Sequence, residues 1–306
     1  MNNLFKFGDC PFCSASYTIY KEHYETFRQC WVCGGRIKLG EPYVKNDLSY
    51  ISVLPDLKGE SREEDGYVIQ NGVLVAAPEN VEVVKIPEGT LAIGAEVFAN
   101  RRYITRVIIP DGVLYIGTMA FCGCERMRDI RLPDSLIAIA NCAFLECRCL
   151  TTVKIPRGLR AAGYSLFHNC DNLQVADLPQ DMDYLGGAPY RYCKNLRRMV
   201  IPDCVNDIYV WFTDLFSLTE LVLGTQVAEC DGIPTERLRS LVFRRTEGWH
   251  MNIPGRKDEP VFQKELADPK KAALFLYRLD KKKGRLFIPG APTRNYSLFR
   301  MPPTEG

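Results

Sequence analysis

The stretch "IPDGVLYIGTMAFCGCERM" at residues 109–127 is followed, from residue 132, by the closely similar stretch "LPDSLIAIANCAFLECRCL". An aromatic residue follows the proline by eleven positions in five successive copies, and a cysteine follows it by fourteen positions in four copies. A fixed period of this length is typical of a solenoid, in which short units stack on one another. The prolines are 23 residues apart in every case, at Pro87, Pro110, Pro133, Pro156, Pro179 and Pro202.

Each copy contains two short segments that favour β-structure. Before the proline, apolar residues alternate with variable ones, as at Val107 and Ile109, which predicts a strand with one buried face. The proline ends that strand because it has no amide hydrogen to donate. A second apolar position follows six residues later, as at Ile116 and Ile139, and predicts a second extended segment. Units this small must stack to bury their apolar faces, so the sequence predicts a β-rich solenoid with parallel strands.

The array extends beyond the regular copies on both sides. Two looser copies follow, with strand-like segments at residues 220–223 and 240–243. The repeated phrase IPxxVxxIxxxAFxxCxxLxxVxI resembles that of the BspA-like bacterial subfamily of leucine-rich repeats. Residues 67–90 resemble the hairpin that often opens such arrays. This resemblance covers residues 67–243 and implies a binding or adhesion surface without catalytic residues.

The first forty residues contain a different pattern. Cys10 and Cys13 form one CxxC pair, Cys30 and Cys33 form a second, and sixteen residues separate the pairs. This spacing favours a structural zinc site with four thiolate ligands, and the segment resembles a zinc ribbon. A redox dithiol and simple buried cysteines are the alternatives. His23 lies between the pairs, but four thiolates already complete a tetrahedral site.

The cysteines of the repeats are expected to play a different role. Cys124, Cys147, Cys170 and Cys193 recur with the period, so they should form a column with a spacing of roughly 4.8 Å. A good disulfide needs Cβ atoms about 3.8 Å apart, so parallel stacking disfavours bonds within the column. We therefore predict small buried packing groups. His168 is close in sequence to Cys170, but the column position favours a structural role for this cysteine over a catalytic one.

Composition and charge further narrow the classes of protein to which this chain can belong. The chain has 306 residues, a net charge of +2 and 46% hydrophobic residues, which suffices for a core but indicates no general affinity for polyanions. It has no apolar run long enough to span a membrane, and its first residues lack the pattern of a signal peptide. These features predict a cytoplasmic protein that does not associate with membranes.

The sequence predicts four regions. Residues 1–40 form the zinc ribbon, residues 41–66 a linker, residues 67–243 the solenoid, and residues 244–306 a partly helical C-terminal cap with a basic tail. Asp268 and Pro269 suit the start of a helix within this cap.

We expect a non-catalytic protein that binds another protein through the outward side of the repeat strands. The sequence has no phosphate-binding loop, no carboxylate pair and no nucleophile with its base, so an enzyme is not expected. The alternative is a nucleic-acid-associated protein that binds through the zinc ribbon and the basic tail. The residues predicted to contact a protein partner lie two or four positions before a proline, and are Arg106, Asp129, Arg131, Lys154, Asp177 and Arg198.

Overall fold

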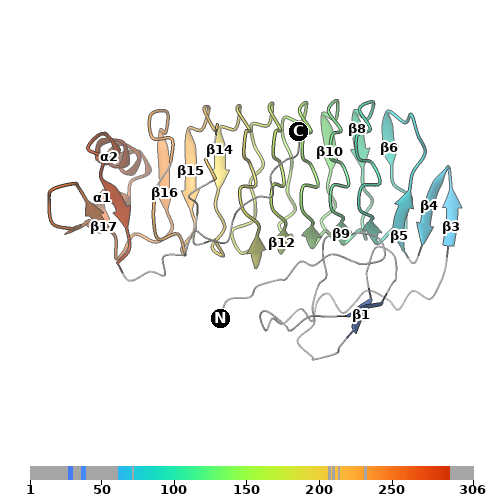
Figure 1. The fold of residues 1–306 in the computed structure, drawn as a ribbon, viewed down its shortest axis with the longest axis horizontal. Coiled ribbons are helices and arrows are strands. Elements are labelled where there is room, and N and C mark those ends of the chain that lie inside the picture. The colour runs from blue at the N-terminus through green and yellow to red at the C-terminus, as the bar shows by residue number, and fades with distance from the viewer. Residues whose placement is uncertain are drawn as a thin grey trace.

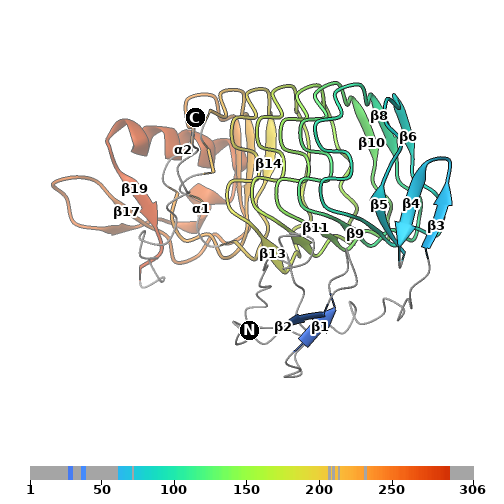
Figure 2. The ribbon, with the colours of Figure 1, turned by 45° about the vertical axis from the view of Figure 1, so that its right-hand side comes forward.

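The computed structural model describes residues 61–70, 72–205, 208, 211–212, 214–230 and 233–289, and it describes residues 27–29 and 36–38 as backbone. The repeats form an elongated solenoid with two helices at its C-terminal end (Figure 1). Most repeats contribute a short strand to each of two rows, which run along opposite sides of the coil (Figure 2). The prediction of a solenoid with parallel strands is confirmed.

The first row is an eight-stranded sheet that opens with antiparallel strands. β3 pairs with β4 and β4 pairs with β5 in antiparallel register, whereas all later strands join in parallel. The strands of this sheet are β3 (Ser61–Glu64), β4 (Tyr67–Gln70), β5 (Val73–Ala76), β7 (Ala92–Ile93), β9 (Tyr115–Ile116), β11 (Ala138–Ile139), β12 (Ala161–Ala162) and β13 (Tyr184–Leu185).

The opening hairpin begins earlier than the sequence predicted. Residues 61–64, which were assigned to the linker, form β3 and pair with β4. Asp65 and Gly66 connect the two strands with φ angles of 49° and 78°. Two central residues with positive φ make a turn that matches the twist of paired strands, and Asp-Gly is a favoured sequence for it. Residues 61–66 are therefore part of the folded solenoid and not of a linker.

The second row consists of the strands that precede the prolines. One parallel sheet contains β6 (Val83–Lys85), β8 (Arg106–Ile108) and β10 (Asp129–Arg131), and another contains β14 (Arg198–Val200), β15 (Glu220–Leu223) and β16 (Ser240–Phe243). Between the two sheets, a bridge joins Thr152 to Val175. β15 and β16 confirm the two looser copies.

Columns of equivalent residues fill the space between the rows. Phe98, Phe121, Phe144, Phe167 and Tyr190 form a stack in which successive ring centroids are 5.1 to 5.7 Å apart. Each column cysteine donates its Sγ–H to the carbonyl oxygen of the aromatic residue in the preceding copy, at 2.9 to 3.2 Å. All four are buried free thiols, as predicted, and burial raises the pKa of Cys124 to about 12.

The turn around the aromatic residue of each copy has a special backbone geometry. Two positions per copy have left-handed φ angles, nine and thirteen residues after the proline. The first is occupied by Glu96, Met119, Cys142, Ser165 and Ala188, with φ between 50° and 59°. The second is occupied by Asn100, Gly123, Glu146, Asn169 and Tyr192, with φ between 59° and 69°. The residue types vary, so the sequence gives no glycine signal for these turns.

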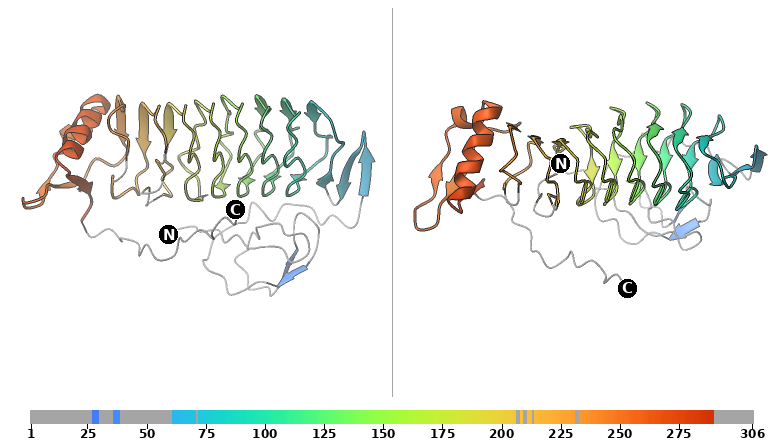
Figure 3. Two further views of the ribbon diagram at one scale, coloured as in Figure 1. Left: turned by 45° about the horizontal axis from the view of Figure 1, so that its top comes forward. Right: turned by 90° about the horizontal axis from the view of Figure 1, so that it is seen from above.

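The C-terminal region combines a small antiparallel sheet with two helices, visible at one end of the molecule in Figure 3. Its elements are β17 (His250–Asn252), β18 (Glu259–Pro260), α1 (Gln263–Leu266), α2 (Pro269–Lys281) and β19 (Arg285–Phe287). Asp268 caps α2, because its carboxylate accepts hydrogen bonds from the backbone amides of Lys270 and Lys271 at 3.0 and 2.9 Å. α2 packs against β16, the last parallel strand. Neither described helix combines the length and apolar character needed to cross a bilayer.

Candidate binding face

The outward side of the second row of strands is the candidate site, and we call it the strand face. Along each strand, the residues between the outward positions point into the core, as the burial of Val107, Ile130 and Val153 shows. All six charged residues predicted from the sequence lie on the strand face. Its exposed and half-buried residues are Val83, Lys85, Arg106, Ile108, Asp129, Arg131, Thr152, Lys154, Val175, Asp177, Arg198, Glu220, Ser240 and Val242.

Ion pairs neutralise charges at both ends of the strand face. Arg106 Nε lies 2.9 Å from Asp129 Oδ2, because the two residues are opposite each other in β8 and β10. At the other end, the Arg198 guanidinium lies 2.9 Å from Asp177 and 3.0 Å from Glu220. Partial burial lowers the pKa of Arg198, but its hydrogen bonds to Glu220 and Asp177 outweigh that effect and raise it. Such exposed pairs contribute at most about 1 kcal/mol each to stability.

The centre of the strand face carries unbalanced positive charge. Arg131 and Lys154 occupy equivalent positions in consecutive copies, so both lie on the same side of the second row. Both side chains are exposed, and within the described residues neither makes a hydrogen bond or an ion pair. Two neighbouring cations without a counter-charge produce a local positive potential. Lys85, at the equivalent position of β6, is likewise exposed, and its side chain makes no hydrogen bond or ion pair within the described residues.

The strand face becomes apolar toward the C-terminal end. Val200 lies two residues before Pro202, as Lys154 does before Pro156, and the alternation in the sequence predicts that it faces outward like Lys154. It is nevertheless buried, and so is Val222. The two valines are opposite each other in β14 and β15 and each covers part of the other, because both side chains are apolar and compact. The prediction of solvent exposure for Val200 was therefore wrong.

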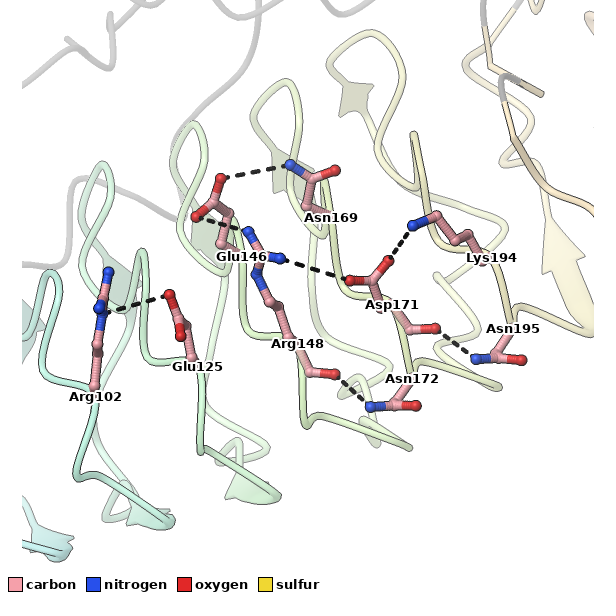
Figure 4. A network of polar contacts seen from close by, with 9 residues as sticks. All are labelled: Arg102, Glu125, Glu146, Arg148, Asn169, Asp171, Asn172, Lys194 and Asn195. Carbon is pink, nitrogen blue, oxygen red and sulfur yellow. Dashed lines mark hydrogen bonds and ion pairs between the residues drawn. The ribbon is translucent and has the colours of Figure 1, made fainter.

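A second polar surface follows the turns beside the strand face (Figure 4). Arg148 lies 3.5 Å from Glu146 and 4.0 Å from Asp171, which also contacts Lys194 at 3.1 Å. Further along, Asn172 and Asn195 each donate a hydrogen bond to a backbone carbonyl of the preceding copy, at 2.9 and 2.8 Å. The sequence analysis missed this network, although Asn172 and Asn195 are one period apart. Its charges are mutually paired, so it stiffens the edge of the solenoid.

The cysteine and histidine suggested as a possible nucleophile pair do not form one. Cys170 is fully buried, and its Sγ–H bonds to the carbonyl oxygen of Phe144 at 3.1 Å. Burial raises the pKa of this thiol well above its ordinary value. His168 is half-buried and packs edge-on against Tyr192, and burial lowers its pKa. A buried neutral thiol that is engaged with the backbone is a structural group.

The predicted zinc ligands Cys10, Cys13, Cys30 and Cys33 lie outside the described residues, as does the basic tail from residue 290. Within the described part of the chain, no cluster of three or more metal-ligating side chains is present. The backbone of β1 (Phe27–Gln29) pairs in antiparallel register with β2 (Arg36–Lys38). Cys30 and Cys33 fall in the connection between these two strands.

Comparison with known proteins agrees with this architecture. Residues 91–219 match, in six copies, the family described as the BspA type leucine rich repeat region. This part of the chain is therefore a leucine-rich repeat solenoid of the BspA type, as its sequence pattern predicted. No curated protein matches the chain significantly.

Several solved structures resemble the solenoid. A leucine-rich cell surface protein from Faecalibacterium prausnitzii is 22% identical with a TM-score of 0.53, and the match covers 62% of this chain and 56% of that chain. A leucine-rich repeat protein of T. pallidum is 26% identical with a TM-score of 0.47, over 55% of this chain and 80% of that chain. A leucine-rich repeat protein from Bacteroides ovatus is 22% identical with a TM-score of 0.44, and the match covers 56% of this chain and 52% of that chain. The chain thus spans about half the length of the F. prausnitzii and B. ovatus proteins, and the F. prausnitzii structure supports the fold alone.

Proposed function

We propose that this leucine-rich repeat protein is a non-catalytic interaction scaffold that binds a protein partner through the strand face. The observation that carries this proposal is the pair of exposed, unpaired cations Arg131 and Lys154 at the centre of the face. The neighbouring ion pairs Arg106–Asp129 and Asp177–Arg198 satisfy one another and leave these two cations available. A partner with carboxylates at the matching positions would supply the missing counter-charges.

The composition of the face favours a protein partner over a uniform polyanion. Asp129 and Asp177 interrupt the row of cations and each neutralises an arginine, so the face lacks the continuous positive charge that a phosphate backbone favours. Ile108 and Val175 are half-buried and offer apolar contact area on the same surface. Mixed charges with apolar residues between them are typical of surfaces that bind folded proteins.

Charge reversal at the centre of the face should weaken binding without affecting the fold. We expect the double variant Arg131→Glu/Lys154→Glu to reduce the affinity for the partner by about tenfold or more, because attraction becomes repulsion. The free energy of unfolding should change by less than about 0.5 kcal/mol per site, since both side chains are exposed. Affinity capture from the native host, followed by titration with the captured partner, measures the first effect, and thermal melts measure the second.

The matched control is Lys257→Glu, a charge reversal at an exposed residue outside the strand face. It should leave partner binding unchanged. Equal binding by the double variant and the wild type would contradict the proposal. Tight binding of single-stranded DNA or RNA that weakens steeply with salt would instead favour a nucleic-acid partner.

The proposal includes one structural zinc ion per chain, held by Cys10, Cys13, Cys30 and Cys33. Two residues between thiolates allow both sulfurs to reach one metal, and the four together complete a tetrahedral site. The pairing of β1 with β2 supports this assignment, because the second CxxC pair lies between these two strands in the sequence.

Replacing Cys10 and Cys33 with serine should release the metal, because two of the four thiolates disappear. We expect about one zinc per chain in the wild type and in the control Cys149→Ser, and loss of the metal from the double variant. Elemental analysis of protein purified without chelator measures the ratio. Zinc-free wild-type protein in which all four thiols are reduced would refute the site.

A further inference from the structure

A second outward surface of the solenoid is apolar and almost completely buried. It lies on the eight-stranded sheet, and we call it the alanine face. Its residues are opposite one another in the parallel strands β5, β7, β9, β11 and β12. Their exposed fractions are 0 to 5%. The alanine face consists of Val73, Ala92, Tyr115, Ala138 and Ala161.

The burial of the alanine face is not explained by the core of the solenoid. The alternate residues of the same strands, such as Ile93, Ile116 and Ile139, belong to the hydrophobic core between the two rows. Because successive side chains of a strand point to opposite sides, the alanine face points away from that core. On the other row, outward residues are exposed, as Lys154 is, or covered by an equally large neighbour, as Val200 is by Val222. Ala92 and Ala138 are too small to cover the ring of Tyr115 between them, and this ring is fully buried. Another part of the molecule therefore covers the alanine face.

A buried polar group close to β9 in the sequence lacks a partner among the described residues. Thr118 follows β9 by two residues and is 7% exposed. Its hydroxyl group has no hydrogen-bond partner within the described residues. Buried hydroxyl groups are almost always hydrogen-bonded, because an unpaired one costs about 1 to 3 kcal/mol. A segment that covers the alanine face can supply this partner.

We propose that residues 1–60 of the same chain dock on the alanine face. The chain enters the solenoid through β3, which belongs to the same eight-stranded sheet, so the preceding segment starts at the edge of this surface. In Figures 1 and 2 the β1–β2 hairpin is drawn on the side of the coil that carries β9 and β13, away from β8 and β14. The alanine face extends over about 20 Å, a distance that a few extended residues can span.

The composition of the N-terminal segment complements this surface. Residues 1–60 contain ten aromatic residues, whereas the alanine face consists mostly of small side chains. Large rings packed on a row of alanines bury much apolar area without steric conflict. The docked segment closes the eight-stranded sheet to other partners and leaves the strand face as the accessible sheet surface. This inference does not depend on the identity of the partner.

Hydrogen exchange of the full chain tests the docking. We expect Ala138→Arg, which places a long charged side chain on the alanine face, to accelerate exchange in peptides from residues 1–60 by about tenfold or more. Peptides from β8 and β10 should be unaffected. The matched control is Thr152→Arg, the same kind of change at an exposed position of the strand face. Unchanged exchange in residues 1–60 of the Ala138→Arg protein would overturn the proposal.

Photo-crosslinking gives an answer even if Ala138→Arg disturbs the whole fold. A benzophenone amino acid at Tyr184, the half-buried residue that extends the alanine face into β13, should crosslink to peptides from residues 1–60 of the same chain. In a mixture of isotopically light and heavy protein, mass spectrometry distinguishes crosslinks within one chain from crosslinks between two chains. Crosslinks to a second copy, or to solenoid peptides alone, would overturn the proposal. Neither result would affect binding through the strand face, so the two proposals fail separately.

Discussion

Replacing Phe144 with alanine should lower the free energy of unfolding by about 3 to 5 kcal/mol. Phe144 is fully buried in the middle of the aromatic stack, with ring centroids of its neighbours Phe121 and Phe167 at 5.7 and 5.4 Å. Its removal leaves a cavity, because the fixed stacking of the copies prevents the neighbouring rings from closing the gap. The stacked contacts with both neighbours are lost as well. Urea denaturation followed by circular dichroism measures the change.

The matched control is Tyr103→Ala, which removes an aromatic side chain that is 53% exposed. This variant should change stability by less than about 0.5 kcal/mol. If Phe144→Ala were tolerated and Tyr103→Ala were severe, the assignment of inside and outside in the repeats would be reversed. The strand face would then lose its structural basis.

Gly163→Ala should destabilise the protein by about 2 to 3 kcal/mol, although it adds a single methyl group. Gly163 follows β12 at a point where neighbouring copies approach closely. A Cβ atom there would lie 2.4 Å from the backbone nitrogen of Asn141 and 2.7 Å from the carbonyl carbon of Ala140. Both are backbone atoms that the parallel pairing of β11 and β12 holds in place, so relief requires a shift of the adjacent copy.

Gly187→Ala provides the control for this second prediction. Gly187 is exposed, and a Cβ atom added there would meet no other atom within 4 Å. The substitution should therefore be neutral or slightly stabilising, because it reduces the freedom of the unfolded chain. Thermal melts of the two variants compare the same chemical change in two environments. Equal melting temperatures would show that the copies are not packed as closely as described.

Much of the fold could be predicted because each repeat places the same residue types at the same positions. The proline, aromatic and cysteine columns predicted the parallel rows, the ring stack and the buried thiols. The two looser copies were also predicted correctly, since the alternation of apolar residues persists in β15 and β16 after the proline is lost. Columns of identical residue types predict the stacking of the copies directly, because each residue contacts its equivalent in the next copy.

Other features could not be predicted because they depend on how the copies pack together. Glu146 and Met119 adopt left-handed backbone angles that neither residue type favours, and the stacked turns impose them. The burial of Val200 arises from its pairing with Val222 in a copy whose spacing departs from the period. The β3 strand was hidden by its charged composition, even though Asp65 and Gly66 are a recognisable hairpin signal.

The candidate site was predicted in part. The alternation of apolar and variable residues before each proline identified the outward positions of the strand face. Arg106 and Asp129 are one 23-residue period apart, which agrees with their observed ion pair. The contact between Asp177 and Arg198 joins residues 21 apart, so it runs diagonally between copies and follows from side-chain reach. Only the complete set of pairings shows that, among the described residues of the strand face, Arg131 and Lys154 remain without counter-charges, as does Lys85 on β6.

Covalent labelling of lysines in the presence and absence of the captured partner tests the central claim most directly. Lys154 and the control Lys257 are both exposed, so an acetylating reagent should label both in the free protein. In the complex we expect labelling of Lys154 to fall by about tenfold or more while Lys257 stays reactive, because an interface core excludes water and reagent. Unchanged labelling of Lys154 in a saturated complex, with protection elsewhere, would contradict binding through the strand face.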